Sequence, residues 1–364
     1  MRYRVTCLTP TLVGDGQKLS PIDYMVWKDH VNVLDQRRIF KLLAKGPRLD
    51  GYLAQLRKAD KLDFANWGGF AQNFAGRRIP FEHPSLTEMW DRQNSQTLFI
   101  PTFAAGPAGP YLPASALRGA IHTALLFSRW NDGFWKQIGG RFEGDRLPRY
   151  PAEPAEEAAI GLFGYSRMRS FAISDSSPVP VNAMKVYLLR TSTLQARGQG
   201  RFELGWKPNP YFCEMASPGA AFEGIWTERV PIRGRENIRT KTLVAAANAY
   251  AEKVLGLHRQ YAATTSLSGL DRNLSAIEQK LAEVRQSPKA CLLCIGWGGG
   301  LLSKVSTPDT EQESYRKLLR QMPFYSRAIQ TGLPFPKTRK VVHLEGQPAT
   351  LPGWVLLEIM DRQP

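Results

Sequence analysis

The sequence predicts an α+β protein built from compact βαββαβ units with helical insertions. Segments typical of strands and segments typical of helices alternate along the chain, and long connections separate them. Near residues 240–285, two successive segments repeat apolar residues every three or four positions, which predicts a helical hairpin. The length of 364 residues suits two domains or slightly more.

The first part of the chain predicts strands followed by helices. Residues 2–8 alternate as a strand does, and residues 24–34 predict a hairpin that turns at 28–30. The thirty residues after the hairpin look helical. Pro113 then stands at the first turn of a helix that runs to about Phe127.

This last helix has two different faces. One carries an apolar stripe made of Leu117, Ile121, Ala124 and Leu125. The other carries the polar and basic residues Ser115, Arg118, His122 and Arg129, which fall within a sector of about 60°. We expect the first face to pack on the core and the second to meet an anionic ligand.

The second part predicts further strands around the helical hairpin. Strands are expected at 171–174, 185–189, 222–229, 290–295, 341–342 and 354–359. The run 290–295 is apolar throughout, which predicts burial on both faces. Asn237 is the candidate cap of the first hairpin helix, and the second helix ends before Pro288.

Composition favours a polyanionic partner. The chain has 48 Lys and Arg against 32 Asp and Glu, a formal net charge of +16, which favours nucleic acid first and an acidic membrane surface second. A basic surface that serves only solubility is the alternative. No apolar run approaches the roughly 20 residues that cross a bilayer, and no signal-peptide core follows the start, so we expect a cytoplasmic protein without a membrane segment.

A glycine cluster is the sharpest local signal. Gly296, Gly298, Gly299 and Gly300 surround Trp297 at the end of a predicted strand. Such glycines allow positive φ and let backbone amides approach phosphate oxygens, while Trp297 offers a stacking face and Lys304 a charge. A dinucleotide fingerprint fails because Leu301 stands at the third glycine position, and no Gly-Lys-Ser or Gly-Lys-Thr follows for a Walker loop. A turn without a ligand is the alternative.

Metal and cofactor chemistry has no support in the sequence. Cys291 and Cys294 would point to opposite faces of a strand, and the five histidines are scattered. We expect the cysteines to be small core residues and expect no cofactor. Asp15 and Asp175 are the best-placed carboxylates, and each is interpreted as a turn residue.

Two further basic patches stand outside the glycine cluster. Arg233, Arg235, Arg239 and Lys241 lead into a predicted helix. Lys337, Arg339 and Lys340 follow two prolines near the carboxyl end. A charge run is usually a solvated face, so each patch alone is weak. Together with Arg118 and the glycine cluster, the patches fit a groove that follows a phosphate backbone.

Four blocks of sequence stand in a characteristic order. They are LTPTLVGDG at 8–16 with LSPIDY at 19–24, YLPASALRGA at 111–120, LFG at 162–164 with ISDS at 173–176, and GWGGG at 296–300 with PKTRK at 336–340. These blocks resemble the RAMP superfamily of CRISPR effector proteins. Their order and the chain length are most similar to the fifth subunit of type III-A Csm complexes. The sequence departs from the family pattern at Ala114, where glycine is usual.

The resemblance implies two ferredoxin-like halves of the RNA-recognition type, placed at 1–165 and 166–364, which often interleave. It implies a non-catalytic subunit that binds CRISPR RNA, caps the filament at the RNA 3′ end and supports maturation of that end. The implied partners are CRISPR RNA, the repeated backbone RAMP subunit and the small helical subunit, with target RNA met indirectly. The RNA-binding set also takes in Gly14 and Gly16 of the first block, and Lys18 between its two parts.

Two other functions stay open at this point. A repeat-cleaving RAMP ribonuclease would use a histidine and a tyrosine without metal, and His30 and Tyr24 are its candidates. A pure assembly adaptor would touch neighbouring subunits and hardly meet RNA.

Overall fold

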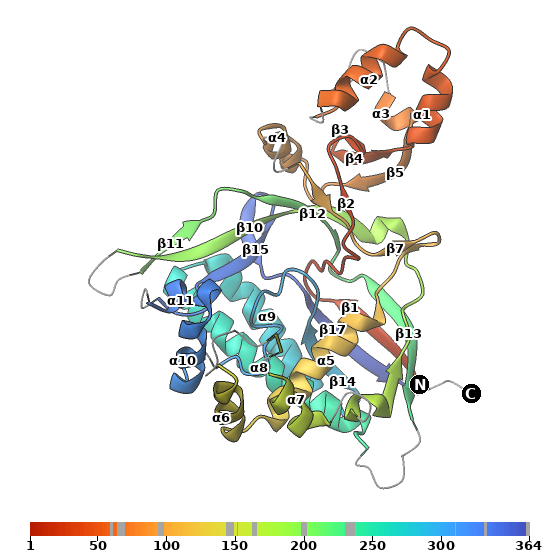
Figure 1. The fold of residues 1–364 in the computed structure, drawn as a ribbon. Coiled ribbons are helices and arrows are strands. Elements are labelled where there is room, and N and C mark those ends of the chain that lie inside the picture. Colours follow the sequence, from red (N-terminus) through yellow and green to blue (C-terminus); the bar gives the residue numbers. More distant parts are fainter. Residues whose placement is uncertain are drawn as a thin grey trace.

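The computed structural model describes residues 1–58, 61–63, 70–93, 98–142, 149–150, 152–161, 166–197, 202–229, 237–309, 311–330 and 333–361. It confirms the α+β class: two curved antiparallel sheets and their covering helices form the main body, and a smaller module projects from it (Figure 1). Within these residues, no helix is both long and apolar enough to cross a membrane.

A five-stranded antiparallel sheet is the centre of the main body. Its strand order is β14-β17-β1-β13-β9. The bounds are Ala290–Cys294 (β14), Trp354–Met360 (β17), Arg2–Cys7 (β1), Ala221–Glu228 (β13) and Phe171–Ile173 (β9). The predicted strands at 2–8, 222–229 and 354–359 are therefore confirmed, and so is the buried strand that begins at residue 290.

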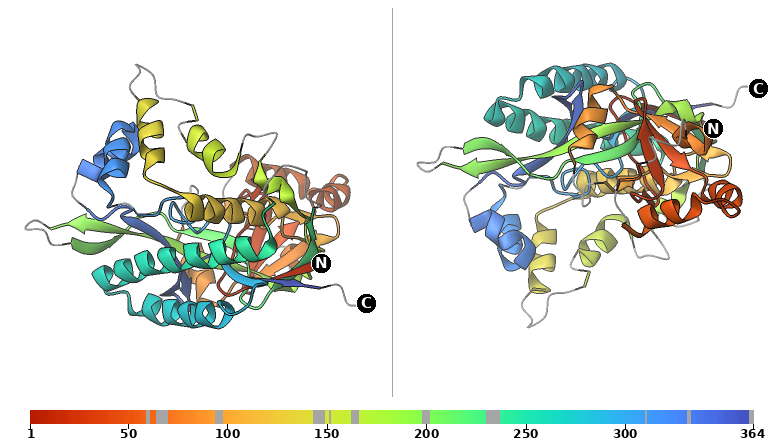
Figure 2. Two further views of the ribbon diagram at one scale, coloured as in Figure 1. Left: turned by 90° about the horizontal axis from the view of Figure 1, so that it is seen from below. Right: turned by 90° about the horizontal axis from the view of Figure 1, so that it is seen from above.

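Long helices cover one face of this sheet. They are α5 (Ala114–Arg129), α8 (Thr240–Thr265) and α9 (Ser268–Val284). Helices α8 and α9 run side by side as the predicted hairpin, and α5 packs against α8 (Figure 2). Tyr3, Val5 and Cys7 of β1 are buried in the same core, whereas Arg2 and Arg4 point to solvent. The alternation of β1 thus decides which face receives the helices.

The strand order places the two ends of the chain next to each other. β17-β1-β13-β9 follows the order of a βαββαβ unit, with α5 between β1 and β9, α8 after β13, and β14 added at the edge. The sheet draws β1 from the segment 1–165 and the other strands from 166–364. The division into two ferredoxin-like halves near residue 165 stays a prediction, and this sheet contains strands from both sides of it.

A second sheet extends beyond the first. Its order is β11-β10-β15-β16, and β12 also pairs with β10. The bounds are Met184–Ala196 (β10), Phe202–Trp206 (β11), Tyr211–Ala216 (β12), Thr338–Leu344 (β15) and Gln347–Thr350 (β16). Because β10 has 13 residues, β11 and β12 pair with its two halves in succession. The expected strand at 185–189 is thus only part of a longer one.

The projecting module follows the predicted hairpin. It contains β3 (Tyr24–Trp27), β4 (His30–Leu34), β5 (Ala75–Pro80), α1 (Gln36–Leu43), α2 (Leu49–Lys58) and α3 (Phe70–Asn73). Lys28 and Asp29 form the turn with φ of 47° and 58°, and the helical prediction after it is confirmed by α1 and α2. The helices enclose a small core of their own around Ile39 and Tyr52.

Short elements complete the fold. The remaining helices are α4 (Ser85–Asp91), α6 (Gly133–Gly140), α7 (Glu153–Ile160), α10 (Glu313–Gln321) and α11 (Pro323–Gln330), with short 3-10 turns η4 (Arg167–Ser170) and η5 (Val181–Ala183). β2 (Lys18–Leu19) pairs with β6 (Ile100–Pro101), and β7 (Ala105–Gly106) pairs with β8 (Gly109–Pro110).

The predicted cap of α8 is wrong. The residue before the helix is Arg239, not Asn237, and it makes no side-chain cap. The carboxylate of Glu228, at the end of β13, instead accepts a hydrogen bond of 2.7 Å from the backbone N–H of Thr240. A residue brought close by the fold has replaced the local cap.

One buried ion pair connects the projecting module to the main body. Nη2 of Arg77 in β5 lies 3.0 Å from Oε2 of Glu214 in β12, whose side chain is fully buried. The amide of Phe103 donates to the same oxygen at 3.3 Å. Burial raises the pKa of the Glu214 carboxyl, although Arg77 acts in the opposite direction. Arg77 therefore supplies the countercharge that lets Glu214 stay ionised.

We predict that Arg77→Met lowers the free energy of unfolding by about 3 kcal/mol near neutral pH, because it leaves a buried carboxylate without a cation. Since the folded-state pKa of Glu214 lies above its unfolded value, the loss should shrink as pH falls through that pKa and the carboxyl becomes protonated. Urea unfolding at several pH values measures both effects. Arg37→Met, at an exposed position of α1 in the same module, removes a charge that makes no ion pair with a described residue and should be nearly neutral; equal losses in the two variants would contradict the role of the pair.

Candidate nucleic-acid interface

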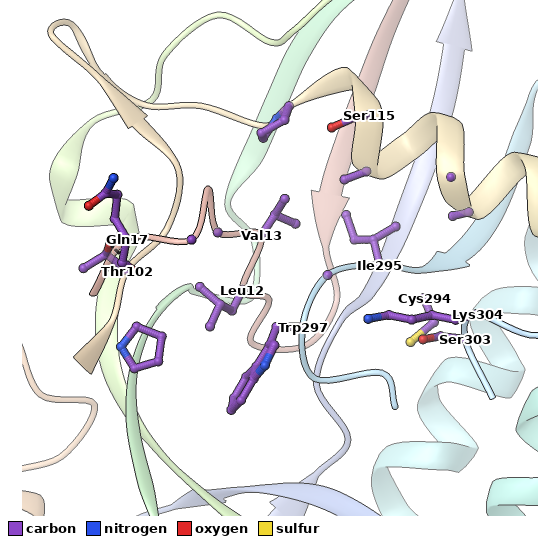
Figure 3. A pocket seen from close by; sticks show the side chains of 18 of the residues that line it. Leu12, Val13, Gln17, Thr102, Ser115, Cys294, Ile295, Trp297, Ser303 and Lys304 are labelled. Carbon is purple, nitrogen blue, oxygen red and sulfur yellow. Dashed lines mark hydrogen bonds between the residues drawn. The ribbon is translucent and has the colours of Figure 1, made fainter. Parts of the chain in front are cut away.

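Three of the predicted segments converge on one cleft of about 680 Å³. Figure 3 shows Ser115, at the start of α5, across the cleft from Trp297 and Lys304. The predicted site residues that line it are Gly14, Gly16, Lys18, Ser115, Gly296, Trp297 and Lys304. They come from the loop after β1 and the start of β2, from the first turn of α5 and from the segment after β14. The fold thus assembles a shared surface from Gly14 and Lys304, positions 290 residues apart in the sequence, and from residues between them.

The cleft is positively charged. Lys18 and Lys304 are exposed, and none of the described residues that line the cleft is acidic. The ammonium of Lys18 lies 4.4 Å from the ring centre of Phe99. Neither lysine makes an ion pair with another described residue. Both charges are therefore available to a phosphate backbone.

Asp175, which was interpreted as a turn residue, also binds the amino end of α5. Its carboxylate accepts a hydrogen bond of 2.7 Å from the amide of Ala114, the first residue of α5. A carboxylate at a helix amino end is favourable because it satisfies a free donor and meets the positive end of the dipole. Asp175 therefore fixes the direction of α5 and so the position of Ser115 at the cleft.

The glycine cluster adopts the predicted backbone, but its close contacts are with the protein itself. Gly296 and Gly300 have φ of +80° and +69°. The amide of Trp297 donates to the carbonyl of Leu12 at 2.8 Å, and a Cβ on Gly296 would overlap that same oxygen. A Cβ on Gly298 would overlap Pro352. The loop uses this amide to dock on the segment after β1, so it does not face phosphate; the phosphate-binding role of the other amides of the cluster stays a prediction.

Trp297 is half-buried, and one of its faces is covered. The ammonium of Lys340 lies 3.1 Å from the indole centre, and Tyr211 meets the ring edge-on at a centroid distance of 5.5 Å. Burial lowers the pKa of Lys340 to about 8. Only the other face of the indole is left for a base to stack on, so the predicted stacking role stays a prediction.

The polar and basic face of α5 borders a second hollow of about 590 Å³. Ser115, Arg118 and His122 line this hollow together with η4. Arg118 donates to the carbonyl of Met168 at 3.1 Å and lies over the ring of Phe171. Burial lowers the pKa of His122, and the positive charge of Arg118 adds to this effect while Glu156 opposes it. The polar and basic face of α5 therefore carries less positive charge near neutral pH than the sequence suggested.

The remaining predicted residues lie elsewhere. Gly298, Gly299, Gly300, Arg339 and Lys340 line a separate cavity on the other side of the glycine loop. Arg239 and Lys241 stand at the start of α8, where Arg239 lies 3.6 Å from Glu228, and neither lines the cleft. The carbonyl of Lys337 accepts from Leu194 in β10. Arg233 and Arg235, like the 162–164 block, fall outside the described residues.

Sequence reasoning missed several residues of these surfaces. Thr102 and Ser303 line the cleft, and Lys207 and Tyr211 line the separate cavity. Lys207 follows β11 and approaches Lys340 only because β10 lies between β11 and β15. No local spacing in the sequence carries that signal.

The candidate acid-base pair of the ribonuclease alternative is not assembled. The side chain of Tyr24 is buried, and its hydroxyl donates to the carbonyl of Leu98 at 2.6 Å. Burial raises the pKa of Tyr24, so this hydroxyl is poorly suited to give up its proton in acid-base cleavage of RNA. His30 pairs with Trp27 in the hairpin, at the end opposite Tyr24.

Comparison with known proteins agrees with the resemblance. The family model described as the RAMP superfamily matches residues 4–303. A chain in the cryo-EM structure of a Csm–crRNA–target RNA ternary complex of a type III-A CRISPR-Cas system is 19% identical, with a TM-score of 0.69, covering 98% of this chain and 100% of that one. The crystal structure of T. onnurineus Csm5 is 17% identical, with a TM-score of 0.63, covering 97% and 99%. None of the curated proteins matches the sequence.

The docked glycine loop can be tested with two alanine variants. Gly296→Ala should lower the free energy of unfolding by more than about 2 kcal/mol, because strain at positive φ adds to the overlap with Leu12. Gly300→Ala is the matched control: its φ is also positive, but a Cβ there meets nothing within 4 Å, so the loss should be about 1 kcal/mol. Denaturant unfolding measures both. Similar losses would show that the loop is not held against Leu12.

Proposed function

Because the chain belongs to the RAMP superfamily, we propose that it is a CRISPR RNA-binding subunit of a type III-A Csm effector complex. The observation that carries this proposal is the cleft, where exposed lysines, Ser115 and Trp297 converge without an acidic residue in the described lining. Such a surface suits a single-stranded ribose-phosphate chain, because cations follow the backbone and an aromatic face receives a base. The guide sequence would be read by base pairing and not by this chain.

Its place in the complex is the filament end at the 3′ end of the CRISPR RNA. There it would contact the repeated backbone RAMP subunit and the small helical subunit, meet target RNA indirectly and support maturation of the RNA 3′ end. The fold likeness over almost the full length of a chain from a crRNA-containing Csm complex supports this placement, as does the likeness to T. onnurineus Csm5. A cytoplasmic location follows from such a role.

We propose a non-catalytic role at the cleft. General acid-base cleavage of RNA needs a side chain that exchanges protons near neutral pH, most often histidine or a carboxylate. The described lining of the cleft has neither. The lining offers lysines, hydroxyls and backbone instead, which hold a strand without attacking it.

RNA affinity should depend on Lys18 and Lys304. Replacing both with Gln should weaken binding of a labelled single-stranded RNA and reduce the slope of log affinity against log salt by about 0.7 for each lysine. Fluorescence anisotropy over a salt series measures the slope on the full chain. Lys317→Gln, on the exposed face of α10, removes an equal charge away from the cleft and should leave the slope unchanged. An unchanged slope in the double variant would refute RNA binding at the cleft.

Cleavage separates the leading proposal from the ribonuclease alternative. The full chain, incubated with repeat RNA in the presence of a chelator, should give no product. Product that forms with the wild-type chain and disappears with His30→Ala would establish the ribonuclease instead. Tyr24→Phe is a poor test by itself, because the buried hydroxyl also bonds Leu98 and Trp90.

A further inference from the structure

A second, smaller cavity lies behind the glycine loop. Its volume is about 260 Å³, and it is enclosed by β10, β15, α8, the start of β17 and residues 298–302. Among the described residues, Cys294 alone lines both this cavity and the larger cleft. Residues 296 and 297 face the cleft while 298–300 face the cavity, so the loop is a wall between the two.

Cationic side chains line the cavity, and no acidic side chain among the described residues does. Lys207, Arg339 and Lys340 line it, together with the hydroxyl-bearing residues Thr191, Tyr211 and Thr338, and none of the described lining residues is Asp or Glu. Three positive groups around so small a volume repel one another unless an anion lies between them.

Of the three cations, Arg339 is the most deeply buried and so has the greatest need of a countercharge. It is only 9% exposed, its Nε donates to Nδ1 of His258 at 3.0 Å, and its Nη1 donates to the carbonyls of Pro336 and Thr338 at 2.6 and 2.9 Å. The guanidinium also lies 4.5 Å from the ring centre of Tyr261. All of these partners are uncharged, since burial and Arg339 hold the pKa of His258 well below its usual range.

No described residue supplies the missing negative charge. Arg339 makes no ion pair within the described chain, and its second terminal nitrogen, Nη2, makes no hydrogen bond there. A buried cation without a countercharge is costly. A bound anion would supply that charge to Arg339.

We propose that this cavity is a binding site for a single phosphate group, held by Arg339, Lys340 and Lys207. The volume falls below the roughly 300–1,000 Å³ of ordinary small-molecule pockets, which suits one tetrahedral oxyanion and excludes a whole nucleotide. A guanidinium and ammonium groups are the side chains that bind phosphate most strongly. The phosphate can be a free ion or belong to the end of an RNA strand that passes the glycine loop.

The charge of the site should depend on pH through Lys340. Burial lowers its pKa to about 8; Cys213 of β12 opposes this shift, and Lys304 and Lys207 add to it. Lys340 is therefore charged below that pH and neutral above it. Sulfate keeps a constant charge in this range. The affinity of the cavity for sulfate should therefore fall as pH rises through about 8, the pKa of Lys340 in the absence of an anion.

The test measures the melting temperature of the full chain against inorganic phosphate, and separately against sulfate, at constant ionic strength. A ligand that binds the folded state alone raises the melting temperature in a saturable way. The wild-type chain should show this rise, and Lys340→Gln and Lys207→Gln should each weaken binding, the former by at least about tenfold. Lys317→Gln, on the exposed face of α10 and away from the cavity, loses the same charge and should behave as the wild type.

Arg339→Gln removes the central cation of the site but can prevent folding, because Arg339 is buried. Lys207→Gln and Lys340→Gln keep the proposal testable in that case, since Lys207 is exposed and Lys340 is only half-buried. No saturable rise in the wild-type chain would overturn the proposal, and so would a rise of equal affinity in all variants. Neither result depends on Lys18 or Lys304, so failure here is distinct from failure of the RNA cleft.

Competition identifies the source of the phosphate. Short single-stranded RNAs with a 3′-phosphate and with a 3′-hydroxyl are added to the chain in the presence of phosphate. Stronger competition by the phosphorylated strand, lost in Lys340→Gln, assigns the site to an RNA end. Saturable phosphate binding that neither strand disturbs assigns it to the free ion. Both results support the site.

Discussion

The docking of the glycine loop on the segment after β1 is the contact on which the rest of the cleft depends. The hydrogen bond from Trp297 to Leu12 joins the carboxyl end of β14 to the first loop of the chain, and the amide of Gly353 donates to the carbonyl of Pro10 beside it. Gly296 has no space for a side chain at this point. The glycines thus serve close packing of three backbone segments, and the cationic cleft is a consequence of that packing.

The pairing of charges explains how a net charge of +16 becomes a local surface. Several arginines are bound to carboxylates on other parts of the molecule, as Arg4 is to Glu223 at 2.6 Å and Arg77 to Glu214 at 3.0 Å. The lysines of the cleft and the smaller cavity have no such partners among the described residues. Arg4 and Arg77 are held in defined ion pairs, while the lysines of the cleft and the smaller cavity keep charges that a polyanion can bind.

The glycine loop links the two cationic spaces. Its first residues face the cleft and its later ones face the cavity, and Lys340 in β15 covers one face of Trp297 while also lining the cavity. An anion bound next to Lys340 would keep that ammonium charged and so affect the indole that it covers. Lys340 lines the cavity and contacts Trp297 of the cleft, which is why the occupancies of the two sites are expected to influence each other.

Local patterns in the sequence predicted the features that depend on near neighbours. They predicted the hairpin at 24–34, the two long helices of 240–285 and the buried strand that begins at residue 290, because periodicity and turn chemistry act over a few residues. The blocks also indicated the family. Those patterns did not predict that β17 pairs with β1, that the β11–β12 connection brings Lys207 to the cavity, or that Arg339 is buried and faces away from the cleft. Pairing across hundreds of residues and the depth of a side chain are properties of the whole packed chain, and no local pattern encodes them.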